Sequence, residues 1–283
     1  MSNSNIEIAY AEALDLARSH YENFPVVSFL IPKHLRKHVA IVYQFARQAD
    51  DLADEGEFSK EQRIASLEKY ESAFKKCLEN DYENDFWCAV ANTVNSFKLT
   101  PQNFSNLIFA FKQDVTKNRF ESFEEILFYC RHSANPVGRI VLELHDIRDV
   151  KLFALSDSIC TALQLTNFYQ DVNIDIDKNR IYVPMDDFAK YEITENQYLN
   201  GQYDEKFSSL MKYQVDRAER LFIEGEQLIP HLPGLLRQEI KWTVLGGMKI
   251  LERIREHNYD TFSNRPELNK TDMLKLIFKS FII

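Results

Sequence analysis

Apolar residues recur every three or four positions along most of the chain, which is the spacing of one face of an α-helix. Glycines, prolines and short polar stretches separate the periodic segments and mark where helices end. The predicted helices cover residues 8–21, 33–55, 59–79, 85–97, 122–130, 136–145, 151–174, 207–228 and 235–256, and one more begins at Thr100. We therefore expect an all-α protein, with any site built between facing helices.

Two predicted helix starts carry the capping-box pattern. Ser59 stands three residues before Gln62, and Ser122 stands three residues before Glu125. In such a box, each of the two side chains bonds the backbone N–H at the other position. Residues 175–184 lack helical periodicity and are predicted to be a polar loop that leads to a short extended piece.

Aspartates stand four residues apart in two predicted helices. Asp50 and Asp54 form one pair, and Asp171 and Asp175 form the other. This spacing places two carboxylates one above the other on a helix, where they repel each other unless a partner intervenes. An unfavourable arrangement that occurs twice suggests a cation between the two sets, and Mg²⁺ that holds a diphosphate is the leading candidate.

Neighbouring polar residues extend each pair into a stripe along its helix. The first stripe contains Tyr43, Arg47, Asp50 and Asp54, with Asp51 adjacent, and the second contains Gln164, Asn167, Asp171 and Asp175. A solvated helix face is the simpler explanation of one such stripe. Both helices are, however, too apolar around the stripe for ordinary surface helices, and buried carboxylates are costly unless they are paired or metal-bound. A ligand-binding role is therefore favoured.

Basic and aromatic residues complete the chemistry of diphosphate release. Arg47, Arg180 and Arg265 are candidates for charge-assisted hydrogen bonds to a diphosphate, while a metal ion neutralises it as its C–O bond breaks. The carbocation left behind needs a dry cavity lined by ring faces. Tyr43, Tyr129 and Phe168 are the aromatic residues whose positions suggest this role.

Composition excludes several other classes of protein. The 34 basic and 43 acidic residues give a net charge of −9, which argues against a nucleic-acid partner and agrees with recruitment of metal cations. The four cysteines lack zinc-site spacing and are interpreted as reduced thiols. Neither a signal peptide nor a membrane-spanning run is visible, so we expect a cytoplasmic protein. The apolar residues 274–283 are interpreted as a last helix on the core, with contact with a membrane surface as the alternative.

Both aspartate segments resemble the signature motifs of the squalene/phytoene synthase family. The resemblance lies in Asp50-Asp51-Leu-Ala-Asp54 and in residues 167–182, which run from Asn167 to Tyr182. It extends over most of the chain and includes residues 20–28, similar to an N-terminal flap, and residues 42–47, 129–130, 137–138 and 259–265. Two such motifs at this separation in the sequence are far more specific than a single pair of aspartates four residues apart.

The resemblance implies an all-α isoprenoid synthase fold, a single domain over residues 1–283 with a central active-site cavity, and head-to-head chemistry on C15 or C20 prenyl diphosphates. Asp50, Asp54, Asp171 and Asp175 would bind Mg²⁺, assisted by Asp51 and Asn167. Arg47, Arg180, Tyr182 and Arg265 would face the diphosphate. Tyr43, Tyr129 and Gln164 would lie near the reacting carbons.

Three departures from the family pattern bear on the branch. Residues 133–138 read Ser-Ala-Asn-Pro-Val-Gly in place of Val-Ala-Gly-x-Val-Gly, Gln170 replaces a common arginine, and Tyr21 and Asn23 replace common serines. These variants resemble the hydroxysqualene synthase branch. That branch ionises presqualene diphosphate and quenches the rearranged cation with water, so no NADPH is expected. It works beside a separate presqualene diphosphate synthase and ahead of a reductase.

Two other functions stay open at this level. The first alternative is an enzyme that condenses two prenyl diphosphates to presqualene diphosphate, squalene or phytoene. The second alternative is a non-catalytic helical scaffold, although a scaffold has no need of stacked carboxylates. With a C30 substrate and a lipid product, peripheral contact with the inner face of the membrane is expected even without an anchor.

Overall fold

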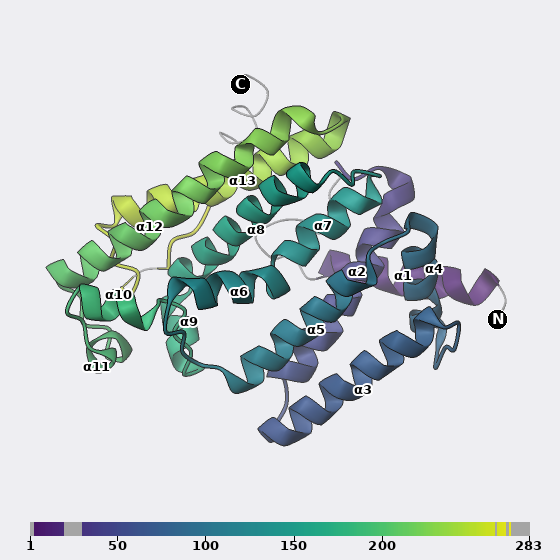
Figure 1. Ribbon diagram of the computed structural model, residues 1–283, viewed down its shortest axis with the longest axis horizontal. Helices are drawn as coiled ribbons and strands as arrows, with labels where there is room; N and C mark the ends of the chain where they lie inside the picture. Colours follow the sequence, from purple (N-terminus) through teal and green to yellow (C-terminus); the bar gives the residue numbers. More distant parts are fainter. Residues whose placement is uncertain (1–2, 20–29, 264, 270–271, 273–283) are drawn as a thin grey trace. The chain divides into compact units, whose positions relative to one another are not determined.

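The computed structural model describes residues 3–19, 30–263, 265–269 and 272, and each regular element in this part of the chain is a helix (Figure 1). The all-α prediction is thereby confirmed. The chain divides into two compact units, Met1–Thr116 with Pro136–Asp149, and Lys117–Asn135 with Val150–Ile283. The flap-like residues 20–28 and the apolar residues 274–283 lie outside the described part. None of the described helices is both long and apolar enough to cross a bilayer.

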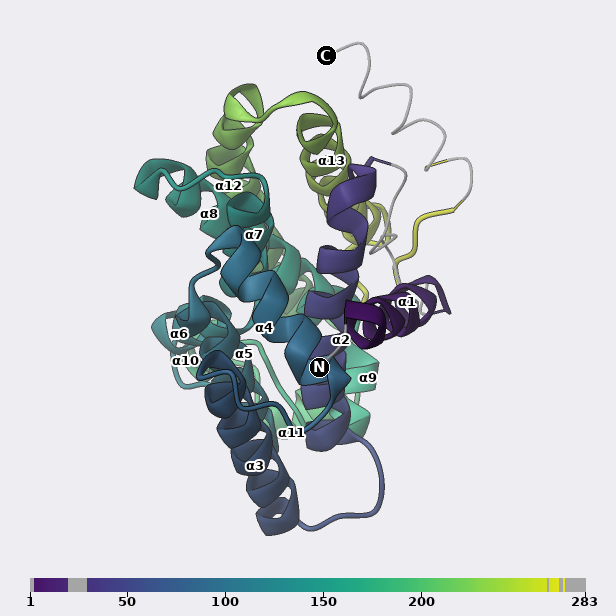
Figure 2. The same ribbon diagram turned by 90° about the vertical axis from the view of Figure 1, so that its right-hand side faces the viewer.

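The first unit is built around one central helix. Its helices are α1 (Asn3–Ser19), α2 (Lys33–Asp54), α3 (Lys60–Leu78), α4 (Asp85–Phe97), α5 (Pro101–Thr116) and most of α7 (Asn135–Leu144). α2 packs against α1, α3, α4 and α5, and α1 lies across it in Figure 2. Ile41, Phe45 and Ala49 of α2 are fully buried. This burial of one apolar face leaves the polar stripe of the first motif on the partly exposed side.

The two predicted capping boxes differ in outcome. Ser59 Oγ accepts from the N–H of Gln62, whose side chain accepts from the N–H of Ser59, so this box is confirmed. The box at Ser122 is wrong, because Ser122 makes no side-chain cap. Glu125 accepts instead from Lys117 Nζ and from the backbone N–H one residue before Ser122. The ammonium group of Lys117 therefore draws the carboxylate away from the cap.

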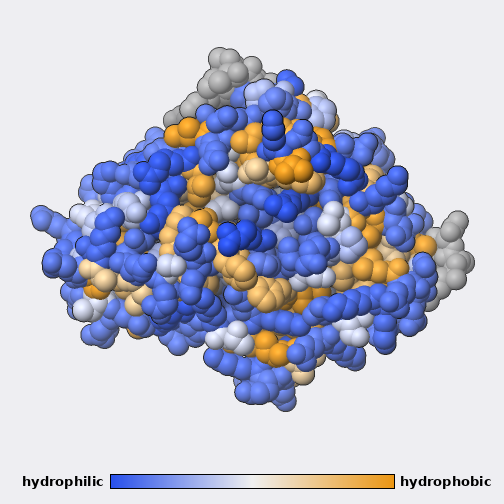
Figure 3. All heavy atoms as spheres, in the orientation of Figure 1, coloured by the Kyte–Doolittle hydropathy of each residue, from blue (hydrophilic) through white to orange (hydrophobic). Residues whose placement is uncertain are grey.

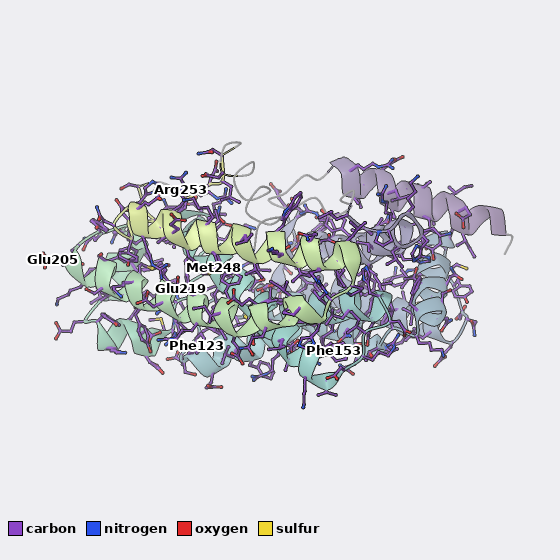
Figure 4. The ribbon with its side chains drawn as sticks, turned by 90° about the horizontal axis from the view of Figure 1, so that it is seen from above. Phe123, Phe153, Glu205, Glu219, Met248 and Arg253 are labelled. Carbon is purple, nitrogen blue, oxygen red and sulfur yellow. The ribbon has the colours of Figure 1, made fainter. Side chains whose placement is uncertain are left out.

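Three long helices form the framework of the second unit. Its elements are α6 (Phe123–Ser133), α8 (Val150–Gln170), α9 (Val172–Asp177), α10 (Met185–Lys190), α11 (Glu195–Leu199), α12 (Glu205–Gly225), the 3₁₀-helix η1 (Glu226–His231) and α13 (Gly234–Glu256). α8 packs against both α12 and α13. α12 and α13 lie side by side (Figure 4). Arg255 of α13 donates to the carboxylate of Glu219 of α12. The short elements α10, α11 and η1 were not predicted from the sequence.

The segment predicted as one helix over residues 151–174 is two helices. α8 ends just before Asp171, whose backbone is non-helical (φ −103°, ψ 22°), and α9 follows. Asp175 lies within α9, so the predicted loop over residues 175–184 begins later than expected. Its last part contains no regular element, and the N–H of Ile181 bonds the carbonyl of Asn118.

Candidate active site

The first aspartate motif carries its own counter-ion. Arg47 Nη1 lies 3.5 Å from Asp50 Oδ2, and Arg47 Nε lies 2.9 Å from Asp51 Oδ1. Tyr43 and Asp54, one turn before Arg47 and at the end of α2, are half-buried. Arg47, predicted to face diphosphate, therefore lies among carboxylates predicted to bind metal. This pairing offsets the repulsion between the stacked aspartates.

The second motif keeps its predicted stripe across the helix break. The N–H of Asp171 bonds the carbonyl of Asn167 at 2.8 Å, and the N–H of Asp175 bonds the carbonyl of Asp171 at 2.9 Å. These are the i to i−4 bonds of an α-helix, so the side chains keep helical spacing. Asn167 is exposed, and Gln164, Asp171 and Asp175 are half-buried.

Arg265 lies beside the second motif although 94 residues separate it from Asp171. Its Nε donates to Asp171 Oδ1 at 2.6 Å, and its Nη1 donates to Glu267 at 2.9 Å. The hydrogen bond that Arg265 donates to the Asp171 carboxylate raises the pKa of Arg265. The structure thus brings a predicted diphosphate ligand directly onto a predicted metal ligand.

Two further side chains hold the segment around Arg265. Gln170 Nε2 donates to the carbonyl of Pro266 at 2.6 Å, and Asn173 Nδ2 donates to the carbonyl of Phe262 at 2.5 Å. The sequence identified Gln170 only as a departure from the family pattern and did not identify Asn173. Their positions beside Asp171 in the chain were the available signal.

Four aromatic rings of the second unit pack together. Phe168 and Tyr182 stack in parallel, with centroids 3.7 Å apart and an interplanar angle of 4°. Tyr129 lies 6.1 Å from Phe168 and 5.9 Å from Tyr182, and Phe120 contacts both tyrosines. All four are buried, with Tyr182 only 7% exposed. Tyr129 and Phe168 were predicted to be aromatic residues of the cavity that holds the carbocation, whereas Phe120 was missed.

Arg119, also missed from the sequence, fixes the turn that precedes Arg180. Its guanidinium donates to the carbonyl and side-chain oxygens of Asn179 at 2.6 and 2.8 Å, and to Glu195 of α11 at 2.8 Å. Asn179 has a left-handed backbone (φ 55°), and the N–H of Arg180 bonds the carbonyl of Asp175 at 2.7 Å. Arg180 is thereby tied to the end of the second motif. A single arginine in a polar stretch offers no sequence signal for this contact.

The family model described as squalene/phytoene synthase matches residues 17–272, a range that runs through both units and both aspartate motifs. The chain belongs to the squalene/phytoene synthase family. Members of this family are isoprenoid synthases that process prenyl diphosphates head to head. The resemblance inferred from the motifs is therefore confirmed.

Relatives of this family member fall on two branches. A hydroxysqualene synthase of Zymomonas mobilis is 40% identical over 178 residues, which are 62% of this chain and 59% of the relative. A 15-cis-phytoene synthase of Synechococcus elongatus is 26% identical over 274 residues, covering 93% of this chain and 89% of the relative.

Solved structures support the same assignment. The squalene synthase HpnC from Alicyclobacillus acidocaldarius is 36% identical and superposes with a TM-score of 0.85, covering 90% of this chain and 95% of that protein. A dehydrosqualene synthase crystallised with a ligand has a TM-score of 0.86 over 98% of this chain and 96% of its own. Its identity of 21% shows a shared fold only.

The family uses a divalent metal, and the residues of each motif fit such an ion. In the described part of the chain, no three His, Cys, Asp or Glu side chains gather into a ready-made metal cage. Mg²⁺ does not require one, because it is usually held by one or two carboxylates together with substrate phosphates and water. The stacked aspartates of either motif supply that number of oxygen ligands. The donor set therefore suits a metal that arrives with a diphosphate.

Proposed function

We propose that this chain converts presqualene diphosphate to hydroxysqualene in squalene and hopanoid biosynthesis. The C–O bond to diphosphate breaks, and diphosphate leaves with the electron pair. The cyclopropylcarbinyl cation rearranges, and a water molecule adds to it and loses a proton. No hydride is transferred, so no NADPH is required. The observation that carries this proposal is the 40% identity to a protein named hydroxysqualene synthase, against 26% to the phytoene synthase.

The polar residues would act on the leaving diphosphate. Mg²⁺ would be bound by Asp50, Asp54, Asp171 and Asp175, with Asp51 and Asn167 assisting, and would neutralise the departing charge. Arg47, Arg180, Tyr182 and Arg265 would bind the diphosphate oxygens. The 2.6 Å contact between Arg265 and Asp171 supports this assignment, because a residue that would bind the diphosphate lies beside one that would bind the metal. The released diphosphate is also the base that takes up the proton from water.

The aromatic residues would act on the cation. Ring faces attract positive charge, and burial excludes water that would quench the cation too early. Tyr129 and Phe168 belong to the buried ring cluster of the second unit. Tyr43 and Gln164, both half-buried on their stripes, would lie nearer the polar end of the substrate.

The test is a product analysis. The purified protein is incubated with Mg²⁺ and no NADPH, in parallel with presqualene, farnesyl and geranylgeranyl diphosphate, and the lipids are analysed. Hydroxysqualene from presqualene diphosphate alone is the expected product. In ¹⁸O-labelled water the alcohol oxygen carries the label, because it comes from solvent. Unreacted presqualene diphosphate would refute the proposal.

Two alternatives have distinct outcomes. Condensation of two prenyl diphosphates is favoured by phytoene synthase relatives that align with 93% of this chain, and it gives presqualene diphosphate, squalene or phytoene in the same assay. A scaffold without catalysis shows no Mg²⁺-dependent binding of diphosphate by calorimetry. For the proposed reaction, the substrate comes from a presqualene diphosphate synthase and the alcohol passes to a reductase. Because the substrate and the product would be C30 lipids, the enzyme would be cytoplasmic and would contact the inner face of the membrane peripherally.

A further inference from the structure

The segment that follows α13 is held on the second aspartate motif at three points. Arg265 pairs with Asp171, and the carbonyls of Pro266 and Phe262 accept from Gln170 and from a side chain of α9. The anchoring residues are Gln170, Asp171 and Asn173, which are consecutive apart from Val172. One helix junction thus supplies both a predicted metal ligand and the anchors of the segment that carries a predicted diphosphate ligand.

Gln170 differs from the other two anchors in its burial. It is 2% exposed, whereas Asn173 is exposed and Asp171 is half-buried. A buried amide is nearly always hydrogen-bonded, because a buried polar group that loses its partner keeps the full cost of its desolvation. The carbonyl that Gln170 bonds belongs to buried Pro266, the residue directly after Arg265. The bond therefore fixes the backbone beside Arg265.

We propose that Gln170 is a positioning residue that holds Pro266 and thereby keeps the guanidinium of Arg265 at the second motif, ready for the diphosphate. Arg265 has a long side chain that is 36% exposed, and ordering such a side chain costs rotamer entropy. A backbone fixed by a buried bond removes part of that cost before the diphosphate binds. The proposal rests on the diphosphate role assigned to Arg265 above.

The test is a double-mutant cycle on the binding of inorganic diphosphate with Mg²⁺, followed by calorimetry. Gln170→Leu removes the donor at nearly constant size and should weaken binding about tenfold, equal to about 1.4 kcal/mol. Arg265→Gln should weaken it as well. The double variant should bind no more weakly than Arg265→Gln alone, because Gln170 acts through Arg265. Additive losses would overturn the proposal.

Thr166→Val is the matched control for Gln170→Leu. Thr166 is equally buried on α8, one turn earlier, and its hydroxyl bonds the carbonyl of Ala162 within the same helix. The control should lower stability without changing diphosphate affinity. A similar loss of affinity in the control would assign both effects to general damage of α8 and overturn the proposal.

Hydrogen exchange of the segment separates this inference from the proposed function. In Gln170→Leu, exchange in peptides covering residues 260–269 should accelerate, while the rest of the second unit stays protected. If the wild-type protein binds no diphosphate, the proposed function fails and the role in diphosphate binding fails with it. The anchoring by Gln170 is then still decided by exchange. Unchanged exchange at residues 260–269 would overturn the anchoring itself.

Discussion

With the roles proposed above, the ion pair between Arg265 and Asp171 would make one guanidinium both a competitor of the metal and a ligand of its diphosphate. Arg265 lies 2.6 Å from Asp171 Oδ1, so a cation that binds this oxygen would compete with the guanidinium for it. Arg265→Gln should therefore raise the affinity for Mg²⁺ alone several-fold, because unlike charges at such a distance attract by at least about 1 kcal/mol. The same variant should bind diphosphate with Mg²⁺ more weakly. Titration calorimetry with each ligand measures both changes.

The control for this prediction is Arg18→Gln, which removes an exposed arginine paired with Asp15 at 3.4 Å on α1. It changes the net charge by the same amount and should alter neither affinity. A parallel loss of both affinities in Arg265→Gln would contradict the competition between Arg265 and the metal.

A buried histidine makes the first unit sensitive to acid. His38 is 7% exposed, its Nδ1 bonds Thr93 Oγ1 at 2.9 Å, and burial together with the charge of Lys37 lowers its pKa to about 4. Between pH 6.5 and 4 the unfolded chain takes up a proton at His38 that the folded chain does not. The free energy of unfolding should therefore fall as the pH drops through this window, by up to about 3 kcal/mol.

Urea denaturation at pH 7, 6 and 5 measures this loss. His38→Gln keeps a hydrogen-bonding side chain beside Thr93 but does not titrate, so its free energy of unfolding should fall less steeply between pH 7 and 5. Carboxylates that titrate in the same range affect both proteins alike. An identical pH dependence in the two proteins would show that His38 is not the sensitive group.

Contacts between site residues that are close in sequence could be predicted, whereas contacts between residues far apart in sequence could not. Arg47 stands three and four residues before Asp50 and Asp51 on one helix, so its contacts follow from spacing alone. The bond between Gln170 and Pro266 joins residues 96 positions apart. Nothing in the local pattern of either residue specifies such a partner, because tertiary packing decides it.

Among the elements, periodicity predicted the long helices well and their interruptions poorly. α4 has the predicted bounds, since its apolar face is continuous and polar residues flank it. The i to i−4 hydrogen bonds continue on either side of Asp171, so the side chains keep their helical spacing across the break. The helical pattern of the sequence therefore runs through Asp171, and the break was missed. The short elements α10 and α11 have five or six residues, too few for a period to appear.

Close contacts between helices lead to a prediction about two glycines. A Cβ at Gly225 of α12 would lie 2.5 Å from Cγ1 of Ile159, and also 2.9 Å from the backbone nitrogen of Ile159 and 3.0 Å from the carbonyl oxygen of Leu155. Gly225→Ala should lower the free energy of unfolding by about 2–3 kcal/mol, because backbone atoms of α8 cannot move aside. At Gly247 of α13 the three atoms nearest to a Cβ all belong to the ring of Phe222, the nearest at 2.4 Å.

The two obstacles should respond differently to a second substitution. Ile159→Ala should not rescue Gly225→Ala, since the backbone contact persists. Phe222→Leu should recover part of the stability lost in Gly247→Ala, since it removes the obstructing ring atoms, although it also reduces core packing on its own. Thermal unfolding followed by circular dichroism measures both pairs. Rescue of Gly225→Ala by Ile159→Ala would show that α8 yields at this contact.

For the molecule as a whole, surface character says less about function than the motifs do. On the face drawn in Figure 3, hydrophobic residues form separate patches among hydrophilic ones. Exposed apolar side chains such as Val150, Ile223 and Leu235 occur in different elements of the second unit. Single exposed apolar residues are normal in soluble and peripheral proteins alike. The expected membrane contact thus rests on the lipid chemistry of the substrate.

The dependence of turnover on the whole chain is open to a direct test. The two motifs belong to different compact units, and the family match runs across both. Asp50→Ala and Asp171→Ala should each abolish product formation and leave the circular dichroism spectrum unchanged. Each aspartate lies on the half-exposed face of its helix, and Arg47 keeps Asp51 as a partner when Asp50 is removed.

If one chain must supply both motifs for one substrate, an equimolar mixture of the two variants should also be inactive. Activity in the mixture would show that motifs from two different chains combine, and full activity in both single variants would refute the metal assignment.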